Sequence, residues 1–274
     1  MRPQGNGFAI IFNTTGIVNF AQGDFVMLGA ILSASLSSTF GLPLPAAVLL
    51  AVAAVAVVGA LMERVLIRSL RDDRSLFIPV MMTMAASIVL NAIALLVWGA
   101  DPLHLNAFSG EMPIRLFGAT LVPQMLWIGG GLAAVMVGLG LFFRFTWLGQ
   151  GMLACAMNRD AAAALGVNVR AMVSLSFVCS AAIGGFGGAL VAPITMATHD
   201  MGGPMTLKGF TAAIIGGLGS VPGALIGGLL LGLFESMSSG IVSSGYRDAI
   251  ALGLLILVLM VKPSGITGVR RVKR

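Results

Sequence analysis

The chain has 274 residues, of which 58% are apolar and only 9% are Asp, Glu, Lys or Arg, against roughly 45 to 50% and about 25% in soluble domains. So few charged side chains cannot cover a soluble domain of this size, and the composition therefore indicates an integral membrane protein. The 16 basic residues outnumber the 10 acidic ones, and they lie in short connections and in the tail. That placement follows the positive-inside rule and argues against a nucleic-acid-binding face.

Several apolar runs are long enough to cross a bilayer as one helix, because a crossing of about 30 Å needs about 20 residues. Four clear runs are residues 43–66, 77–98, 123–143 and 171–192, and residues 246–262 form a fifth near the lower limit of length. Two further stretches, 7–37 and 207–238, are each too long for one crossing and too short for two. The first contains GIVNFAQGD at 16–24, and the second contains GGLGSVPG at 216–223.

These two interruptions predict broken membrane helices. Non-helical backbone is tolerated in a membrane only where protein or a water-filled cavity satisfies its polar groups, so both breaks are expected inside the protein. Interrupted segments in the two halves of a sequence are typical of transporters built from inverted repeats. The alternative is that the glycines only allow close helix packing. The predicted fold is all-α, a polytopic inner-membrane helical bundle of about eight membrane segments in a single domain, residues 1–274.

The basic residues predict the orientation of this bundle. If each broken stretch returns to the face it left, the connection 99–122 lies outside, and the basic tail 263–274 and the C-terminus are cytoplasmic. Glu235 is expected to pair with Arg247 or to lie at an interface. The face that we predict to be cytoplasmic then carries 12 of the 16 basic residues, which are Arg64, Arg68, Arg71, Arg74, Arg144, Arg159, Arg170, Lys262, Arg270, Arg271, Lys273 and Arg274.

The sequence lacks the common motifs of enzymes. No lysine follows a glycine-rich phosphate loop, and neither histidine has the neighbours that a metal site needs. The two cysteines, Cys155 and Cys179, do not form a disulfide framework. We therefore expect no catalytic residue, metal or cofactor in this chain.

The connection at residues 147–170 predicts a short helix lying across the cytoplasmic face of the membrane. Asn158 can cap its start, Asp160 lies in its first turn, where the helix dipole favours an acid, and Gly166 supplies the stop. The alanines between them give a small, rigid surface suited to docking in a groove of a soluble partner. An ordinary interfacial helix is the alternative interpretation.

Three motifs carry a resemblance to a known family. They are DAAAALG at 160–166, GIVNFAQGDFVMLGA at 16–30 and KGFTAAIIGGLGSVPGALIGG at 208–228. In this order and spacing, the chain resembles the LivH-like permease subunits of branched-chain amino acid ABC importers from Phe8 to Gly265.

The resemblance implies a subunit that translocates leucine, isoleucine and valine across the inner membrane. Its implied partners are a second, LivM-like permease, two cytoplasmic ATPase subunits that bind ATP and Mg, and a periplasmic substrate-binding protein. The same machinery carrying urea, short amides or another amino acid stays open, as does a self-contained channel or secondary carrier.

The resemblance also implies two sets of functional residues. For Asp24, a structural role as a helix cap and a contact with substrate both stay open. The coupling helix that docks on the ATPase is expected at Asn158, Arg159, Asp160, Ala161, Ala162, Ala163, Leu165 and Gly166. The translocation pathway is expected at Asn19, Gln22, Gly23, Asp24, Gly216, Gly217, Gly219, Ser220 and Pro222.

The chain departs from the family pattern in two ways. Family members usually carry more apolar sequence ahead of the position of Phe8, so we expect this chain to begin partway through the first membrane segment, as a truncated gene model would. Gln22 stands where the family commonly has His, and Asp24 stands where Glu is common. An amide does not titrate, so proton-linked behaviour at position 22 is excluded, whereas hydrogen bonding is retained.

Overall fold

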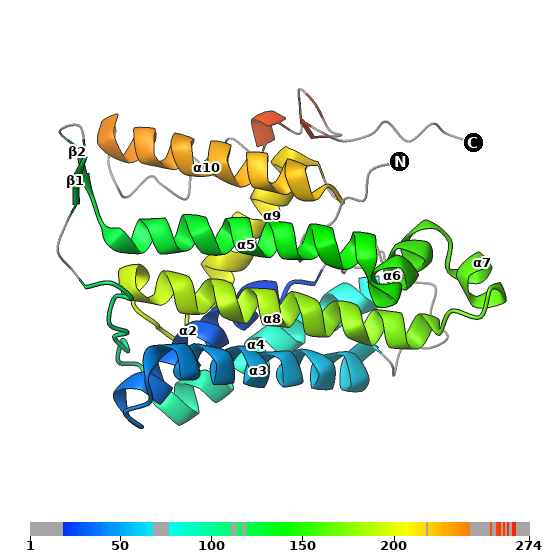
Figure 1. The fold of residues 1–274 in the computed structure, drawn as a ribbon, viewed down its shortest axis with the longest axis horizontal. Coiled ribbons are helices and arrows are strands. Elements are labelled where there is room, and N and C mark those ends of the chain that lie inside the picture. Colours follow the sequence, from blue (N-terminus) through cyan, green and yellow to red (C-terminus); the bar gives the residue numbers. More distant parts are fainter. Residues whose placement is uncertain are drawn as a thin grey trace.

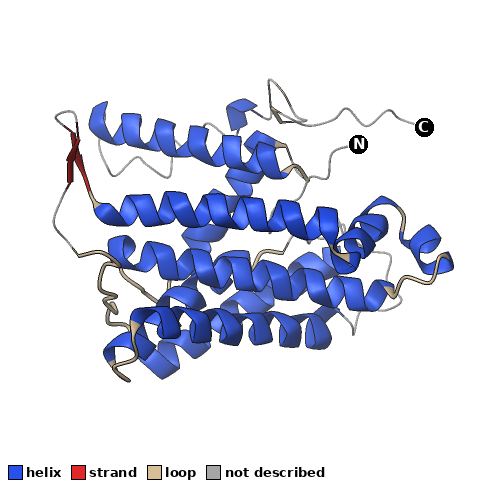
Figure 2. Cartoon of the chain, in the orientation of Figure 1, coloured by secondary structure: helices blue, strands red, loops and turns tan. Residues whose placement is uncertain are grey.

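The computed structural model describes residues 19–67, 77–110, 114–116, 119–217 and 219–241, together with separate positions between 253 and 266. Within these residues the chain is helical, apart from loops and one short two-stranded ribbon (Figure 2). The elements are α2 (Gln22–Ser38), α3 (Leu44–Met62), the π-helical turn η1 (Glu63–Ile67), α4 (Phe77–Trp98), β1 (Ile114–Leu116), β2 (Ala119–Leu121), α5 (Pro123–Phe145), α6 (Trp147–Met157), α7 (Arg159–Ala164), α8 (Val169–Thr195), α9 (Gly202–Gly216) and α10 (Val221–Ile241).

Four helical segments of the described chain are long and apolar enough to cross a membrane, and they confirm the four clear spans predicted from the sequence. A shorter apolar helix, Gly223–Met237, lies in the second half of the predicted interrupted stretch 207–238. The predicted span at 246–262 lies mostly outside the described residues. The four segments are Leu44–Leu66, Ile78–Trp98, Pro123–Phe145 and Val169–Thr195.

The long helices α3, α5, α8 and α10 run along the longest axis of the molecule, whereas α9 crosses them (Figure 1). The short helices α6 and α7 lie at one end, and the antiparallel β1–β2 ribbon lies at the other (Figure 1). Leu103 and Ala197 exchange backbone hydrogen bonds of 2.9 and 3.0 Å, so the loop after α4 is joined to the loop before α9. The two connections that the sequence predicts on opposite faces of the membrane thus lie at opposite ends of the bundle.

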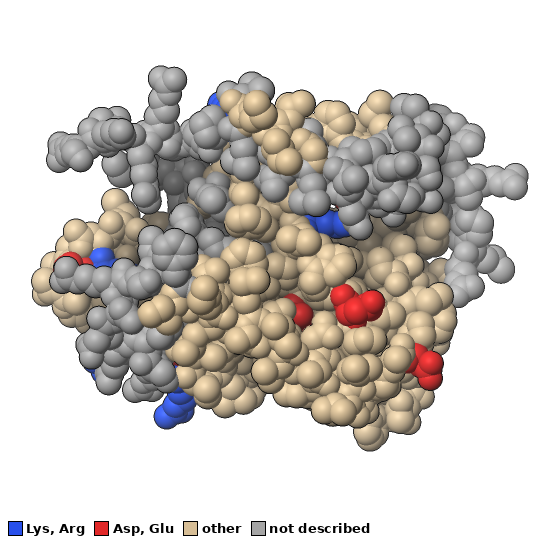
Figure 3. Space-filling model, turned by 180° about the vertical axis from the view of Figure 1, so that it is seen from behind, with Lys and Arg blue, Asp and Glu red and all other residues tan. Residues whose placement is uncertain are grey.

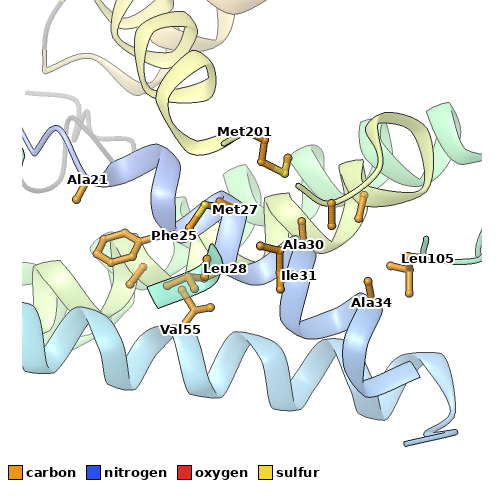
Figure 4. Close-up of a cluster of buried hydrophobic side chains, with 14 of the residues drawn as sticks. Ala21, Phe25, Met27, Leu28, Ala30, Ile31, Ala34, Val55, Leu105 and Met201 are labelled. Carbon is orange, nitrogen blue, oxygen red and sulfur yellow. The ribbon is translucent and has the colours of Figure 1, made fainter. Parts of the chain in front are cut away.

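The core is built around α2, which packs against α3, α8 and α9. Apolar residues of α2 lie on all of its faces, as expected for a helix that is buried rather than amphipathic. Phe25, Met27 and Ile31 are fully buried. Figure 4 shows Phe25 on the side of α2 that faces Val55 of α3, and Met27 on the side of Met201.

The α2–α8 contact depends on the absence of side chains at glycine positions. A Cβ atom at Gly29 would overlap the backbone of Gly185, and a Cβ atom at Gly188 would overlap the carbonyl oxygen of Val26. Small residues let membrane helices approach until their backbones touch, and close packing replaces the hydrophobic effect as the source of stability. The glycines therefore set the distance between α2 and α8.

The outer faces of α3, α4 and α5 expose large apolar side chains, including Leu49, Ile88, Leu96, Leu126 and Val137. On the face shown in Figure 3, charged residues occupy a few spots between broad uncharged areas. A soluble protein does not leave so much apolar surface uncovered. This surface is suited to contact with lipid or with another membrane subunit.

Candidate functional site

Of the first predicted interruption, 16–24, the structure describes residues 19–24, because residues 16–18 lie outside the described part of the chain. Residues 19–21 are not helical, and α2 begins at Gln22. The Phe20 amide donates to the Thr83 hydroxyl at 3.3 Å, and the Ala21 amide donates to Asn19 Oδ1 at 3.0 Å. Side chains thus satisfy backbone groups that a continuous helix would satisfy itself.

Thr206 of α9 joins this interruption to the second half of the chain. Its hydroxyl accepts a hydrogen bond from the Gly23 amide at 2.9 Å and lies 3.1 Å from the Phe20 carbonyl and 3.0 Å from the Gly202 carbonyl, either of which can accept its proton. The rings of Phe20 and Phe210 are 5.7 Å apart between centroids. The start of α2 is therefore attached to α9 by both polar and aromatic contacts.

Gln22 joins α2 to α8 through Ser180. The Ser180 hydroxyl donates to Gln22 Oε1 at 2.6 Å, and Gln22 Nε2 donates to the Ser180 carbonyl at 3.2 Å. Gln22 is 7% exposed and Ser180 is fully buried, so water does not compete with this pair. The amide predicted from the sequence to keep a hydrogen-bonding role makes two hydrogen bonds.

The Asp24 carboxylate lies where the first turns of two helices converge. Asp24 is fully buried in the first turn of α2, and its Oδ1 touches Gly202 at the start of α9. The partial positive charge at a helix N-terminus favours an acidic group. Neither oxygen makes a hydrogen bond of good geometry within the described residues, although the Ser87 hydroxyl lies beside the carboxylate. Asp24 thus lies at two helix starts, and neither helix has a cap hydrogen bond from the side chain of its own N-cap residue; its role as a structural residue or as a contact with substrate stays a prediction.

The second interruption is a tight turn between α9 and α10. Gly217 and Gly219 have φ angles of 104° and 89°, a left-handed conformation that residues with a side chain rarely adopt. The Ser220 hydroxyl accepts a hydrogen bond from the Gly223 amide at 3.1 Å and so caps α10. Gly216 touches the backbone of Gly223. The predicted residues Gly216, Gly217, Gly219 and Ser220 are thus brought together here, and Pro222 lies in the first turn of α10.

An ion pair also holds α9 to α10. Lys208 Nζ lies 3.1 Å from Glu235 Oε1 and 3.3 Å from Glu235 Oε2. The structure thus pairs Glu235 with Lys208, and the predicted partner Arg247 lies outside the described residues. The sequence could not indicate this pair, because the turn at 217–220 had first to bring the two helices together.

A cavity of about 300 Å³ lies between α2, α8, α9 and α10. Gln22 and Gly23 are the predicted pathway residues that line it. Asn19, Asp24, Gly216, Gly217, Gly219 and Ser220 are not among the described residues of its wall, although α10 contributes Ala224. The sequence analysis missed the apolar part of the wall, because side chains of this kind occur throughout the membrane helices and nothing in the sequence distinguishes them. These missed residues include Val26, Ile183, Met205 and Ala213.

The predicted coupling helix corresponds to α7, at the end of the molecule (Figure 1). Asn158 Oδ1 accepts a hydrogen bond from the Ala161 amide at 3.0 Å, and Gly166 follows the helix with a φ angle of 86°, so both predicted ends are confirmed. Asp160 lies in the first turn. The surface of α7 that points away from the protein is formed by exposed residues, namely Arg159, Asp160, Ala161, Ala163 and Leu165.

Ala162 has the opposite orientation. It is 2% exposed and packs in a small apolar cluster with Cys155 and Met172. Cys155 lies in α6, and burial raises the pKa of its thiol. Within α7, Ala162 therefore attaches the helix to α6 and α8, whereas the neighbouring alanines are exposed.

Comparisons with known proteins give a family match over most of the chain. Residues 5–259 match the family described as branched-chain amino acid transport system / permease component. The chain is 33% identical to the high-affinity branched-chain amino acid transport system permease protein LivH of Escherichia coli K12, over 96% of this chain and 89% of that protein.

Two further relatives extend the match. The chain is 34% identical to the permease protein BraD of Pseudomonas aeruginosa, again over 96% of this chain and 89% of the relative. It is 28% identical to a probable branched-chain amino acid transport permease protein LivH of Methanocaldococcus jannaschii, over 98% of this chain and 89% of the relative. No solved structure gives a significant match. The chain therefore belongs to the family of permease components of branched-chain amino acid transport systems.

Proposed function

We propose that this chain is the permease subunit of an ABC importer that translocates leucine, isoleucine and valine across the inner membrane. The observation that carries the proposal is the junction at Thr206, where the start of α2 meets α9 beside an apolar cavity. The family match over residues 5–259 supports the cargo, because the named relatives are branched-chain amino acid permeases.

The sequence contains no phosphate-binding loop, so partner subunits supply ATP hydrolysis. In this proposal two cytoplasmic ATPase subunits bind ATP and Mg, a second, LivM-like permease completes the pathway, and a periplasmic binding protein delivers the amino acid. The ATPase docks on α7, with Asp160 and Ala163 in the contact. The exposure of this short capped helix at the end of the bundle supports that role.

The contacts of α8 provide a route from α7 to the cavity. A short turn links α7 to α8, and Ala162 packs against Met172 near the start of α8. Further along α8, Ser180 is bonded to Gln22 and the helix touches the backbone of α2. A displacement of α7 by the ATPase would thus move α8, α2 and the cavity wall together. This is alternating access driven from the cytoplasmic face.

The proposal includes a topology of about eight membrane segments, in which α9 and α10 are the two pieces of one broken element. The end bearing α7 is cytoplasmic, and the same orientation predicts a cytoplasmic C-terminus. Enzymatic reporters fused at residue 110 and at the C-terminus test this orientation. We expect the reporter at residue 110 to lie outside the cytoplasm and the reporter at the C-terminus to lie in the cytoplasm. An extracytoplasmic C-terminus would overturn the topology.

Reconstitution of the complete importer in proteoliposomes tests the function. Uptake of labelled leucine that requires ATP, the ATPase subunits and the binding protein is expected. Leucine uptake by this chain without an ATPase would favour a channel or a secondary carrier. ATP-dependent uptake of urea or a short amide, without uptake of leucine, would support an ABC importer but refute the proposed substrate.

Variants of α7 test the coupling contact. Asp160→Lys and Ala163→Trp are expected to reduce both binding of the ATPase subunits and leucine uptake, since both positions are exposed on the docking surface. Ala53→Trp is the matched control, because Ala53 is exposed on the membrane helix α3. Normal ATPase binding and uptake by both α7 variants would refute the coupling role.

A further inference from the structure

The cavity between α2, α8, α9 and α10 has the properties of a small binding site. Its volume is about 300 Å³, at the lower end of the roughly 300 to 1,000 Å³ of typical ligand sites and equal to about ten water molecules in the liquid. The elements around it are those that flank the two interruptions. Any rearrangement of α9 against α2 therefore changes its shape.

Among the described residues that line the cavity, the side chains are apolar except at one place. Val26, Ile183, Met205 and Ala213 present apolar side chains, and none of the described residues that line the cavity is charged. A ligand with a charged side chain would lose its hydration there without gaining a partner, which costs several kcal/mol or more. An aliphatic side chain meets no such cost and gains from burial. The wall thus discriminates by polarity.

Gln22 is the polar exception in this wall. A primary amide has two N–H donors and two acceptor positions, and the two bonds to Ser180 use one of each. Within the described part of the chain, the second donor and the second acceptor are not used, and they can serve the amino or carboxylate group of a ligand. The bonds to Ser180 also fix the orientation of the amide before a ligand arrives.

We propose that this cavity binds the amino acid in transit, with the branched aliphatic side chain against Val26, Ile183, Met205 and Ala213 and with Gln22 contacting the polar end. The inference rests on the proposed function and adds to it a site, its residues and the reason why charged amino acids are rejected. The size of the residue at position 213 then sets which aliphatic side chain fits best.

A labelling experiment on the assembled importer tests occupancy of the cavity. Ala213→Cys is introduced after Cys155→Ala and Cys179→Ala, and the rate of reaction with N-ethylmaleimide is measured in liposomes. Leucine or valine is expected to slow the reaction severalfold, whereas lysine and glutamate leave it unchanged. Leu207→Cys is the control, because Leu207 lies on the same helix but is 53% exposed and does not line the cavity. Its reaction rate should not depend on any amino acid.

Uptake of leucine and valine by an importer with a narrowed cavity gives an independent test of the site. Ala213→Val is expected to lower the ratio of leucine uptake to valine uptake by about tenfold relative to the unaltered importer, since one methylene in an apolar pocket is worth roughly 10- to 200-fold in discrimination. The same binding protein serves both importers, so its own preference cancels when the uptake ratio of the variant is compared with that of the unaltered importer. Ala53→Val, on the exposed face of α3, should leave the ratio unchanged.

The results separate failure of the site from failure of the function. If the unaltered importer takes up neither leucine nor valine, the proposed function is refuted. If it takes up both, but leucine fails to protect the thiol of the Ala213→Cys variant and Ala213→Val leaves the uptake ratio unchanged, the cavity is not the binding site. Equal protection by lysine and leucine would overturn the proposed discrimination by polarity.

Discussion

Close contact between α2 and α8 predicts opposite effects for the same substitution at two adjacent glycines. A Cβ atom at Gly188 would overlap the carbonyl oxygen of Val26, whereas a Cβ atom at Gly187 would meet nothing within 4 Å. In a helix, replacing glycine by alanine is favourable by roughly 0.5 to 1 kcal/mol. Overpacking a filled contact costs typically about 1 to 3 kcal/mol. Gly187→Ala should therefore stabilise the chain slightly, and Gly188→Ala should destabilise it.

The difference between these two variants isolates the packing effect. Both positions lie in α8, so the gain in helix propensity cancels and the variants should differ by about 1 to 3 kcal/mol in free energy of unfolding. The measurement is equilibrium unfolding of the purified chain in mixed micelles with increasing SDS, followed by tryptophan fluorescence. Equal stability of the two variants would refute the conclusion that glycine sets the distance between α2 and α8.

Three further predictions concern the polar contacts of the site. Thr206→Val removes the hydroxyl that accepts a hydrogen bond from the Gly23 amide, and it should lower the free energy of unfolding by about 1 to 3 kcal/mol. Thr195→Val, at an exposed position of α8, should change the free energy of unfolding little. Ser180→Ala should lower the free energy of unfolding by a similar amount, because it leaves the buried Gln22 amide oxygen without its donor. A double-mutant cycle tests this pair: Gln22→Met should cost less stability in the Ser180→Ala variant than in the unaltered chain. Asn158→Ala should destabilise α7 by about 0.5 to 2 kcal/mol and weaken ATPase binding, whereas Asn158→Asp should preserve both, since either side chain can cap a helix; equal ATPase binding by the two variants would contradict the cap.

The membrane spans and α7 could be predicted because their determinants are local. A long apolar run between polar residues fixes a membrane helix by its length alone, and the four clear runs correspond to four helices. Asn158 and Gly166 act on backbone groups within a few residues of themselves, so the sequence at 158–166 contains everything that defines α7. Predictions of this kind do not require knowledge of the rest of the fold.

Only part of the candidate site could be predicted, because the rest depends on contacts between distant segments. The glycines at 216–219 indicated a break by their own conformational freedom. Thr206, by contrast, is an ordinary threonine until folding places its hydroxyl beside Gly23, 183 residues earlier in the chain. Met205 and Ala213 likewise acquire their role only when α9 packs beside α2. Their residue types occur throughout the chain and carry no separate signal.

Glycine contacts join α2 both to α8 and to α9. Along α8, Gly185 and Gly188 touch the backbone of α2, so α2 and α8 cannot slide independently without losing their closest packing. The start of α2 is packed as closely against α9, because a Cβ atom at Gly23 would overlap the carbonyl oxygen of Gly202. The Thr206 hydroxyl and one aromatic pair add to this contact. The cavity is lined by α2, α8 and α9, so a movement that separates α9 from α2 would have to break a glycine contact as well as the hydrogen bond from the Gly23 amide to Thr206.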